Sequence, residues 1–280
     1  MPAPTAADLE LAHAAAQRVV QTHQRVADFL RIGMKLPQID AFIAKTLEQL
    51  GASSCFLGYT PDRRHFPFPS HACLSVNDCV VHGTAASLER PLVEGDVLKI
   101  DIGVFYRGWV GDAAWTYAIG EPTPAVRRLM DCGKESLRRG IAALKPDAIW
   151  LDWAKTVHPY VESEQKFKLI RGLGGHGIGF KMLHGPPFVS NTMPAYPGEW
   201  PDAMRRCTPG TIVAVEPMIA ISTGDTRQKP LGKGRNDWPV YTADGSMSVH
   251  YEHDVLITED GHKVLSEGLD DLPDVVTRAL

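Results

Sequence analysis

The chain has 280 residues, of which 44% are hydrophobic and 22% charged, and its formal net charge is −4. These are the proportions of a globular protein with a sizeable core, and the negative charge without a Lys/Arg block argues against nucleic acid or an anionic membrane as the main partner. No apolar run approaches the roughly 20 residues that span a bilayer, and the first Lys or Arg, Arg18, comes too late for a secretory signal, so a cytoplasmic location is expected.

The N-terminal part of the chain predicts two helices followed by strands. Apolar residues recur at helical spacing from Leu9 to Leu30, which indicates an amphipathic helix. A second helix is expected from about Pro37 to Leu50, because it has proline near its start and a glycine just past its end. Three strand-like segments follow, at residues 72–81, 96–105 and 109–119.

The same order of elements begins again after Gly120. Helices are predicted at about residues 124–144 and 150–163, and Pro146 separates them. More strand-like segments follow these helices. The alternation of helices and strands in both parts indicates an α/β protein.

Two short segments support an internal repeat. Residues 95–101 and 210–216 both begin with glycine, continue with aliphatic residues and reach an acid six positions on, at the end of an apolar strand. A buried carboxylate needs a partner for its charge, so one acid in each half suggests a site at the junction of the halves. We therefore expect a single domain over residues 1–280, with half-repeats at about residues 6–120 and 122–266.

The cysteines do not predict a cross-linked or zinc-bound protein. They are five in number and show no C-x-x-C spacing, so neither a disulfide framework nor a thiolate zinc site is indicated. We expect reduced packing residues. They are Cys55, Cys73, Cys79, Cys132 and Cys207.

The glycine-rich segment 172–187 contains a literal G-x-G-x-x-G that ends at Gly177. A phosphate-binding loop must lead directly into a helix whose free N–H groups meet the anion. Further glycines and two prolines follow instead, so there is no room for that helix. The segment is better interpreted as a scaffold for the histidines His176 and His184.

A pair of aspartates flanks a predicted hairpin turn. A two-residue loop after Tyr106 leaves Asp101 and Asp112 directly opposite or diagonal on one face of the hairpin. Their Cβ atoms would then be about 4.5 to 8 Å apart, so that either one pKa rises or a cation lies between them. For an isolated pair, the alternative that one aspartate faces solvent remains open.

More ligand-type residues favour a metal centre. Glu216 lies in an apolar run, Glu252 precedes a strand, and glycines around His176 allow close approach of the backbone. Four carboxylates and one histidine suffice for two divalent ions with bridging carboxylates. The histidine moves the preference from Mg toward Mn, Fe, Co or Zn.

Five motifs occur in order along the chain. They are Cys73-Leu-Ser-Val-Asn-Asp-Cys-Val-Val-His82-Gly83, the Asp101/Asp112 pair, Gly175-His-Gly-Ile-Gly179 with His184, Val215-Glu-Pro217 and Tyr251-Glu-His253. With these motifs the chain resembles the methionine aminopeptidases, within the metallopeptidases that include proline-specific peptidases and creatinase. The resemblance covers about residues 10–266 and implies the pita-bread fold, in which two related α/β halves surround a curved, mainly antiparallel sheet.

The resemblance also implies a role for each matching position. Asp101 would be a ligand of one metal, Asp112 and Glu252 would bridge two metals, and His176 and Glu216 would bind the other. The implied cofactors are two divalent ions, Co, Mn, Fe or Zn. A hydroxide that bridges them would attack the peptide carbonyl.

The resemblance places other side chains beside the substrate. His184 would stabilise the oxyanion, His82 would contact the scissile amide and Glu216 would carry the proton to the leaving amine. The implied substrates and partners are N-termini of peptides and nascent chains, with transient association with the ribosome; the expected protein is a monomer with no membrane or nucleic-acid partner. The residues at the family's methionine pocket are Tyr59, Cys73 and Trp238; for Trp238 the alternative of a core aromatic remains open.

Four departures from the family pattern concern the loops. Residues 82–85 read His-Gly-Thr-Ala where the family has His-Gly-Ile-Pro, and His176 and His184 are one residue further apart than usual. His250 replaces the usual Gln before Tyr-Glu-His. An insertion at residues 191–206, rich in Pro and Trp, is expected to overhang the cleft.

Three other functions compete with a methionine aminopeptidase. An Xaa-Pro aminopeptidase or dipeptidase of the same fold usually carries a large N-terminal domain and an Arg before the last glutamate, whereas this chain reads His250-Tyr251 there. A non-catalytic peptide-binding relative would normally have lost ligands. A mononuclear iron oxygenase needs two histidines and one carboxylate, and here carboxylates are in excess.

Overall fold

The computed structural model describes residues 4–61, 66–228 and 238–280. Its helices come in two pairs, each followed by strands, as predicted. Thr5 and Asp8 form a capping box at the start of the first helix, in which the Thr5 side chain accepts from the Asp8 N–H. The paired helices are α1 (Ala6–Phe29), α2 (Leu36–Gln49), α3 (Pro124–Ala143) and α4 (Trp150–His158).

The second helix of the second pair is shorter than the sequence predicts. One helix was expected over residues 150–163, but α4 ends at His158 and a π-helical turn, η1 (Pro159–Glu164), continues the chain. Pro159 has no N–H to continue the α-helical ladder. The turn is closed by the Gln165 N–H, which donates to the Tyr160 carbonyl at 3.0 Å, a bond five residues apart.

The strands of the described residues form two five-stranded and two three-stranded sheets. Their pairing is antiparallel except between β5 and β16, so the predicted mainly antiparallel architecture is confirmed. The first large sheet contains β1 (Ser53–Ser54), β2 (Cys73–Val76), β4 (Val97–Tyr106), β5 (Trp109–Ile119) and β16 (Val275–Val276). The second contains β7 (Gly174–Gly179), β8 (Met182–Ser190), β9 (Ile212–Val215), β14 (His253–Ile257) and β15 (His262–Val264).

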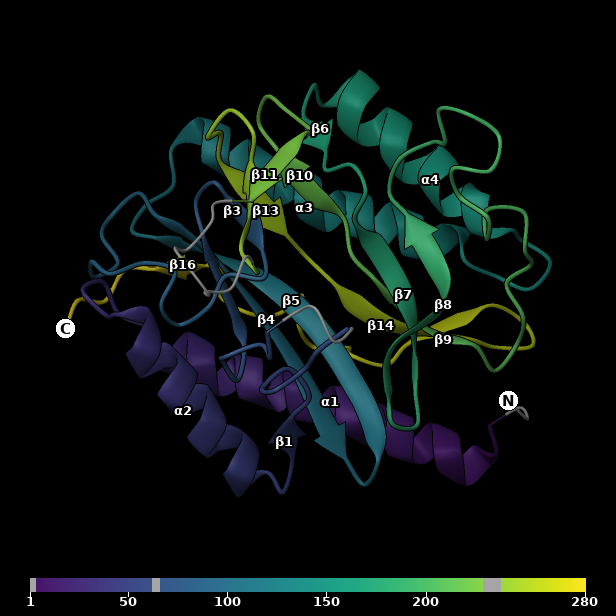
Figure 1. The fold of residues 1–280 in the computed structure, drawn as a ribbon, viewed down its shortest axis with the longest axis horizontal. Coiled ribbons are helices and arrows are strands. Elements are labelled where there is room, and N and C mark those ends of the chain that lie inside the picture. Colours follow the sequence, from purple (N-terminus) through teal and green to yellow (C-terminus); the bar gives the residue numbers. More distant parts are fainter. Residues whose placement is uncertain (1–3, 62–65, 229–237) are drawn as a thin grey trace.

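The small sheets connect the two large ones. One contains β6 (Lys168–Leu169), β10 (Met218–Ala220) and β13 (Ser248–His250), and the other contains β3 (Cys79–Val81), β11 (Thr226–Gln228) and β12 (Val240–Thr242). Figure 1 shows the strands between the helix pairs, with α1 and α2 on one side and α3 and α4 on the other. Among the described residues, no helix is both long and apolar enough to cross a membrane.

The strand predicted over residues 72–81 is wrong as a single element. It divides into β2 and β3 because Asn77 adopts a left-handed backbone, with φ of 57°. The Asn77 side chain donates to Asp96 Oδ1 and accepts from the Val97 N–H, each at 2.8 Å. These bonds to a segment twenty residues away stabilise the turn and start β4.

Helix α1 lies directly against the β4–β5 hairpin. A Cβ atom added to Gly111 would lie 2.6 Å from the backbone carbon of Ala15, so only glycine permits this approach. The buried His23 ring reaches from α1 to the Tyr117 hydroxyl, 3.1 Å away. The hairpin that carries two predicted site residues is thereby fixed on a helix.

The tips of two hairpins, one from each large sheet, contact each other. The Lys181 N–H, in the β7–β8 turn, donates to the Gly108 carbonyl in the β4–β5 turn at 2.7 Å. The rings of Trp109 and Phe180 pack edge to face beside this bond, with centroids 6.0 Å apart. We call this pair of contacts the tip contact; it joins the two sheets directly.

Candidate metal centre and substrate cavity

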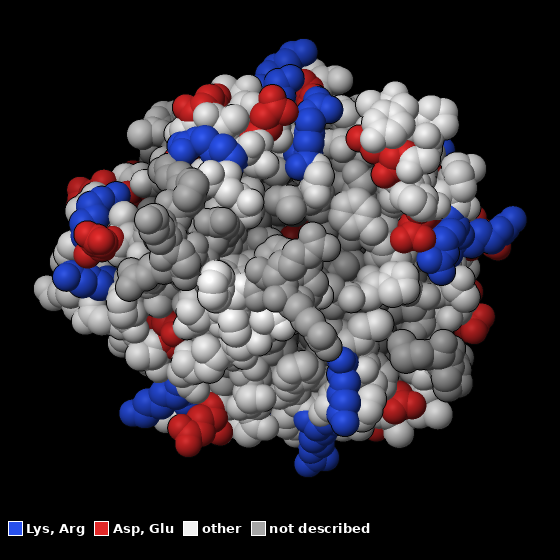
Figure 2. Space-filling model, in the orientation of Figure 1, with Lys and Arg blue, Asp and Glu red and all other residues white. Residues whose placement is uncertain are grey.

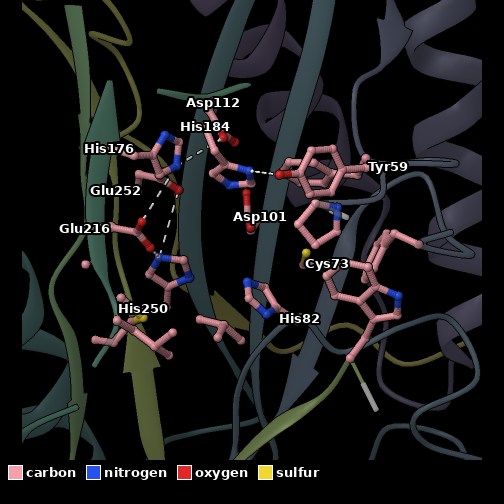
Figure 3. Close-up of a pocket in the computed structure, with 18 of the residues that line it drawn as sticks. Tyr59, Cys73, His82, Asp101, Asp112, His176, His184, Glu216, His250 and Glu252 are labelled. Carbon is pink, nitrogen blue, oxygen red and sulfur yellow. Dashed lines mark hydrogen bonds and ion pairs between the residues drawn. The ribbon is translucent and has the colours of Figure 1, made fainter. Parts of the chain in front are cut away.

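The residues predicted to form the site meet in one cavity of about 480 Å³. They come from both large sheets and from the loops between them, and Figure 3 shows the labelled carboxylates and imidazoles gathered around the same space. Figure 2, in the orientation of Figure 1, shows a small recessed patch of acidic atoms near the centre of this face of the molecule. Most other charged side chains on this face lie near its edge. All ten predicted residues line the cavity: Tyr59, Cys73, His82, Asp101, Asp112, His176, His184, Glu216, Trp238 and Glu252.

The β4–β5 hairpin positions the two aspartates. Its loop is the two-residue turn Arg107-Gly108, whose φ values of 51° and 85° are both positive, as a type I′ turn requires. Asp101 is paired with Ala114 and Asp112 with Gly103, so the aspartates are diagonal neighbours on one face, as predicted. The expectation that Asp101 ends its strand is wrong, because β4 continues to Tyr106.

The second sheet supplies the remaining ligand-type residues. Glu216 directly follows β9, and His176 on β7 is paired with Ala214 of β9. Glu252 lies just before β14, and its N–H donates to the Ala114 carbonyl at 3.0 Å, which joins it to the first sheet. The carboxylates of both halves therefore face one another.

Asp254 is a buried carboxylate behind the cavity that the sequence did not indicate. Its Oδ2 accepts from the Asp112 N–H at 2.9 Å and so fixes the backbone of that aspartate. Burial and then the charge of Asp112 raise the pKa of Asp254 well above its usual range. The alternation of β14 could have revealed it, because residues 252 and 254 share one face of an extended chain.

The cavity concentrates negative charge without a cationic side chain. Burial, followed by the charge of Glu216, raises the pKa of Asp101 to about 8. Burial and neighbouring carboxylates raise the pKa values of Asp112, Glu216 and Glu252 well above their usual range. No Lys or Arg among the described residues lines the cavity. These carboxylates cannot all ionise without a cation between them.

The donor set fits a divalent metal. Oδ1 of Asp101 and Oδ1 of Asp112 are buried with no hydrogen-bond partner, a costly arrangement that a cation would relieve. His176 Nε2 lies 3.9 Å from Asp112 Oδ2 and 3.8 Å from Glu216 Oε1. Ligand atoms of Asp112, His176 and Glu252 all lie within 4.8 Å of one another, close enough to share an ion. Burial lowers the pKa of His176 to about 3, which leaves the imidazole neutral, the form that binds metals.

His250 is a further residue that lines the cavity, and the sequence indicated it only as a departure from a motif. Its Nε2 lies 3.0 Å from Glu216 Oε2 and 3.9 Å from Glu252 Oε2. Burial lowers its pKa to about 3. A second group of ligand atoms within 4.8 Å of one another consists of Glu216, His250 and Glu252.

Aromatic and imidazole rings form the opposite wall of the cavity, as Figure 3 shows for the labelled residues. His184 Nδ1 is 2.7 Å from the Tyr59 hydroxyl, and its ring packs against that of His176 with centroids 4.4 Å apart. His82, with φ of 57°, packs edge to face on Trp238. Burial lowers the pKa of His82 to about 4 and also lowers that of His184. Both rings are thus neutral hydrogen-bonding groups near pH 7.

The altered loops support the cavity rather than cover it. The Ala85 N–H, which proline would lack, donates to Ser70 Oγ at 2.9 Å. The expectation that residues 191–206 overhang the cleft is wrong, because none of them is among the described residues that line the cavity. Instead, the buried Asn191 accepts from the Trp153 indole N–H at 3.0 Å and donates to the Glu216 carbonyl at 2.9 Å.

Comparisons with known proteins agree with this geometry. The model of metallopeptidase family M24 matches residues 10–259. A methionine aminopeptidase of Aquifex aeolicus is 35% identical over 260 residues, which are 93% of this chain and 96% of that protein. The structure of a methionine aminopeptidase from Rickettsia prowazekii superposes with a TM-score of 0.84 at 26% identity and covers 95% of this chain and 99% of that one.

A proline-specific relative shares the fold at lower similarity. An Xaa-Pro dipeptidase from Bacillus anthracis has a TM-score of 0.70 at 19% identity, and the match covers 99% of this chain but 64% of that one. At 19% identity, this structural similarity supports a shared fold but not a shared activity. The predicted pita-bread fold is confirmed by these structural neighbours.

Proposed function

Because the chain belongs to metallopeptidase family M24, we propose that it is a methionine aminopeptidase, a metal-dependent hydrolase that removes the N-terminal methionine from peptides and nascent proteins. The observation that carries this proposal is the cavity itself. Buried carboxylates and a neutral histidine occupy one wall, and an aromatic pocket with two further histidines occupies the other.

The family binds divalent metal, and we propose that this chain holds two ions, of Co, Mn, Fe or Zn, with Asp101, Asp112, His176, Glu216 and Glu252. The excess of carboxylates over cations and the unpaired oxygens of the aspartates support this ligand set. When bound, divalent ions polarise a peptide carbonyl and lower the pKa of water, so that it attacks at neutral pH.

The other side chains would orient the substrate and move its proton. With the Tyr59 hydroxyl donating to Nδ1 of His184, Nε2 carries the proton and can donate to the carbonyl oxygen of the scissile bond. His82, which is neutral near pH 7, would hydrogen-bond the scissile amide. Glu216, whose Oε1 lies in the cavity 3.8 Å from His176 Nε2, would carry the proton to the leaving amine.

We propose that the methionine side chain lies between Tyr59, Cys73 and Trp238. Burial raises the pKa of the Cys73 thiol well above its usual range, so this wall stays uncharged and suits a thioether. Monomeric state, cytoplasmic location and transient association with the ribosome stay predictions.

Hydrolysis of Met-Ala-Ser and Ala-Pro-Gly after chelation and metal add-back tests the function. We expect release of free methionine only with metal, and a nearly inactive Glu216→Ala variant. His71→Gln, in a histidine–carboxylate pair outside the cavity, is the matched control and should keep full activity. Release of alanine from Ala-Pro-Gly alone would establish the Xaa-Pro enzyme instead. No hydrolysis of either peptide, with metal bound, would indicate a non-catalytic relative.

A further inference from the structure

His250 is placed in the cavity by the pairing of β13 with its neighbours. It lies opposite Met218 in the antiparallel β10–β13 pair, which brings it beside Glu216. Thr116 Oγ1 of β5 donates to the His250 carbonyl at 2.6 Å and accepts from the His250 N–H at 3.0 Å. The side chain is only 3% exposed, and Figure 3 shows its ring turned toward the glutamates. The backbone that carries this ring is therefore held by two neighbouring strands.

The environment of His250 resembles that of His176. Each imidazole has its Nε2 within 4 Å of two carboxylate oxygens: His250 faces Glu216 and Glu252, and His176 faces Asp112 and Glu216. Glu252 belongs to both groups of ligand atoms that lie within 4.8 Å of one another. Two ligand atoms of one ion are separated by at most twice a metal–ligand distance of about 2.0 to 2.3 Å. The distances around His250 fall within this limit.

We propose that His250 is an additional nitrogen ligand of a divalent ion that Glu216 and Glu252 also hold. Glu252 would then share one ion with His176 and the other with His250. The inference rests on the proposed metal-dependent function of this cavity. A second imidazole moves the preference of the centre further from Mg toward first-row transition metals. It also adds a ligand without adding charge, which suits a cavity already rich in carboxylates.

The competing role for His250 is that its N–H only orients Glu216 through a hydrogen bond. The His250→Gln variant separates the two roles, because its amide keeps a donor and removes the imidazole. A fall in metal affinity alone does not distinguish a metal ligand from a residue that orients a ligand, because loss of an orienting residue also costs about 10- to 100-fold in metal affinity. The decisive measurement is the number of imidazoles bound to the metal.

We would load the metal-free protein with cobalt and measure X-ray absorption at the cobalt edge, which counts bound imidazoles. The wild type should show an imidazole for each of the two ions, and His250→Gln should show half that number. His71→Gln is the matched control, because its Nδ1 lies 3.0 Å from Asp40 Oδ2, the same separation as between His250 and Glu216. This variant should leave the count unchanged.

The outcomes of this experiment differ from those that test the proposed function. A wild-type spectrum with a single imidazole for two ions, unchanged in His250→Gln, would overturn the inference. The wild-type count needs no variant, so the inference stays testable if His250→Gln fails to fold. A protein that shows both imidazoles but does not release methionine from Met-Ala-Ser would refute the function and leave the ligand assignment intact.

Discussion

Metal binding in this cavity is expected to strengthen steeply with pH, because protons compete with the metal for the carboxylates. Burial raises the pKa of Asp101 to about 8. Its ionised fraction then rises from about one in a hundred near pH 6 to about one half near pH 8, so this group alone increases the apparent metal affinity about 50-fold. His176, with a pKa of about 3, is neutral throughout and adds no slope.

The sign of the stability change is opposite in the metal-free protein. Because the folded pKa of Asp101 is raised from 3.8 to about 8, the unfolded chain binds fewer protons than the folded one within this window. The metal-free protein therefore loses stability as pH rises through it. Bound metal should reverse the trend, so its stabilising effect grows toward pH 8.

Calorimetric titration of the metal-free protein with Mn²⁺, at steps between about pH 6 and about pH 8, measures this linkage. Asp101→Asn is the control, because its amide does not titrate; it should bind more weakly and show a smaller slope. An affinity of the wild type that stays constant across this range would refute the reasoning. The carboxylates would then be ionised before metal binds.

Three further variants test the surroundings of the cavity. Ala85→Pro removes the N–H that donates to Ser70 and should lower the free energy of unfolding in urea by about 1 kcal/mol; an unchanged value would show that the bond contributes nothing. Trp238→Ala opens the aromatic wall and should raise KM for Met-Ala-Ser more than it lowers kcat; the reverse split would contradict a pocket role. Asn191→Ala leaves the Trp153 N–H and the Glu216 carbonyl unpaired and should cost about 2 kcal/mol by thermal unfolding; an unchanged stability would show that these bonds contribute nothing.

The diagonal pair of aspartates could be predicted because its cause is local. A two-residue turn with glycine fixes the register of a hairpin, and the strand period then places Asp101 and Asp112 on one face. The helix pairs were predictable for the same reason, from spacing and from capping residues. In contrast, the break of a strand at Asn77 depends on bonds to Asp96 and Val97, which no local pattern reveals.

The sequence carries a signal for His250 beyond its place in a motif. It lies two residues before Glu252 in an extended segment, where alternate side chains share a face. Its contact with Glu216 depends on the pairing of β10 with β13, which is a tertiary property. The prediction of an overhanging insertion at residues 191–206 failed because the buried hydrogen bonds of Asn191 hold its start against α4.

The tip contact has a consequence for motion. The site residues come from two sheets, and the Lys181–Gly108 bond with the Trp109–Phe180 ring pair joins those sheets at the tips of the hairpins that carry Asp112 and His176. A hinge movement that widened the cleft at that end would have to break the tip contact. We therefore expect the spacing of Asp112 and His176 to be set before any peptide arrives, and adaptation to different substrates to be left to the aromatic wall.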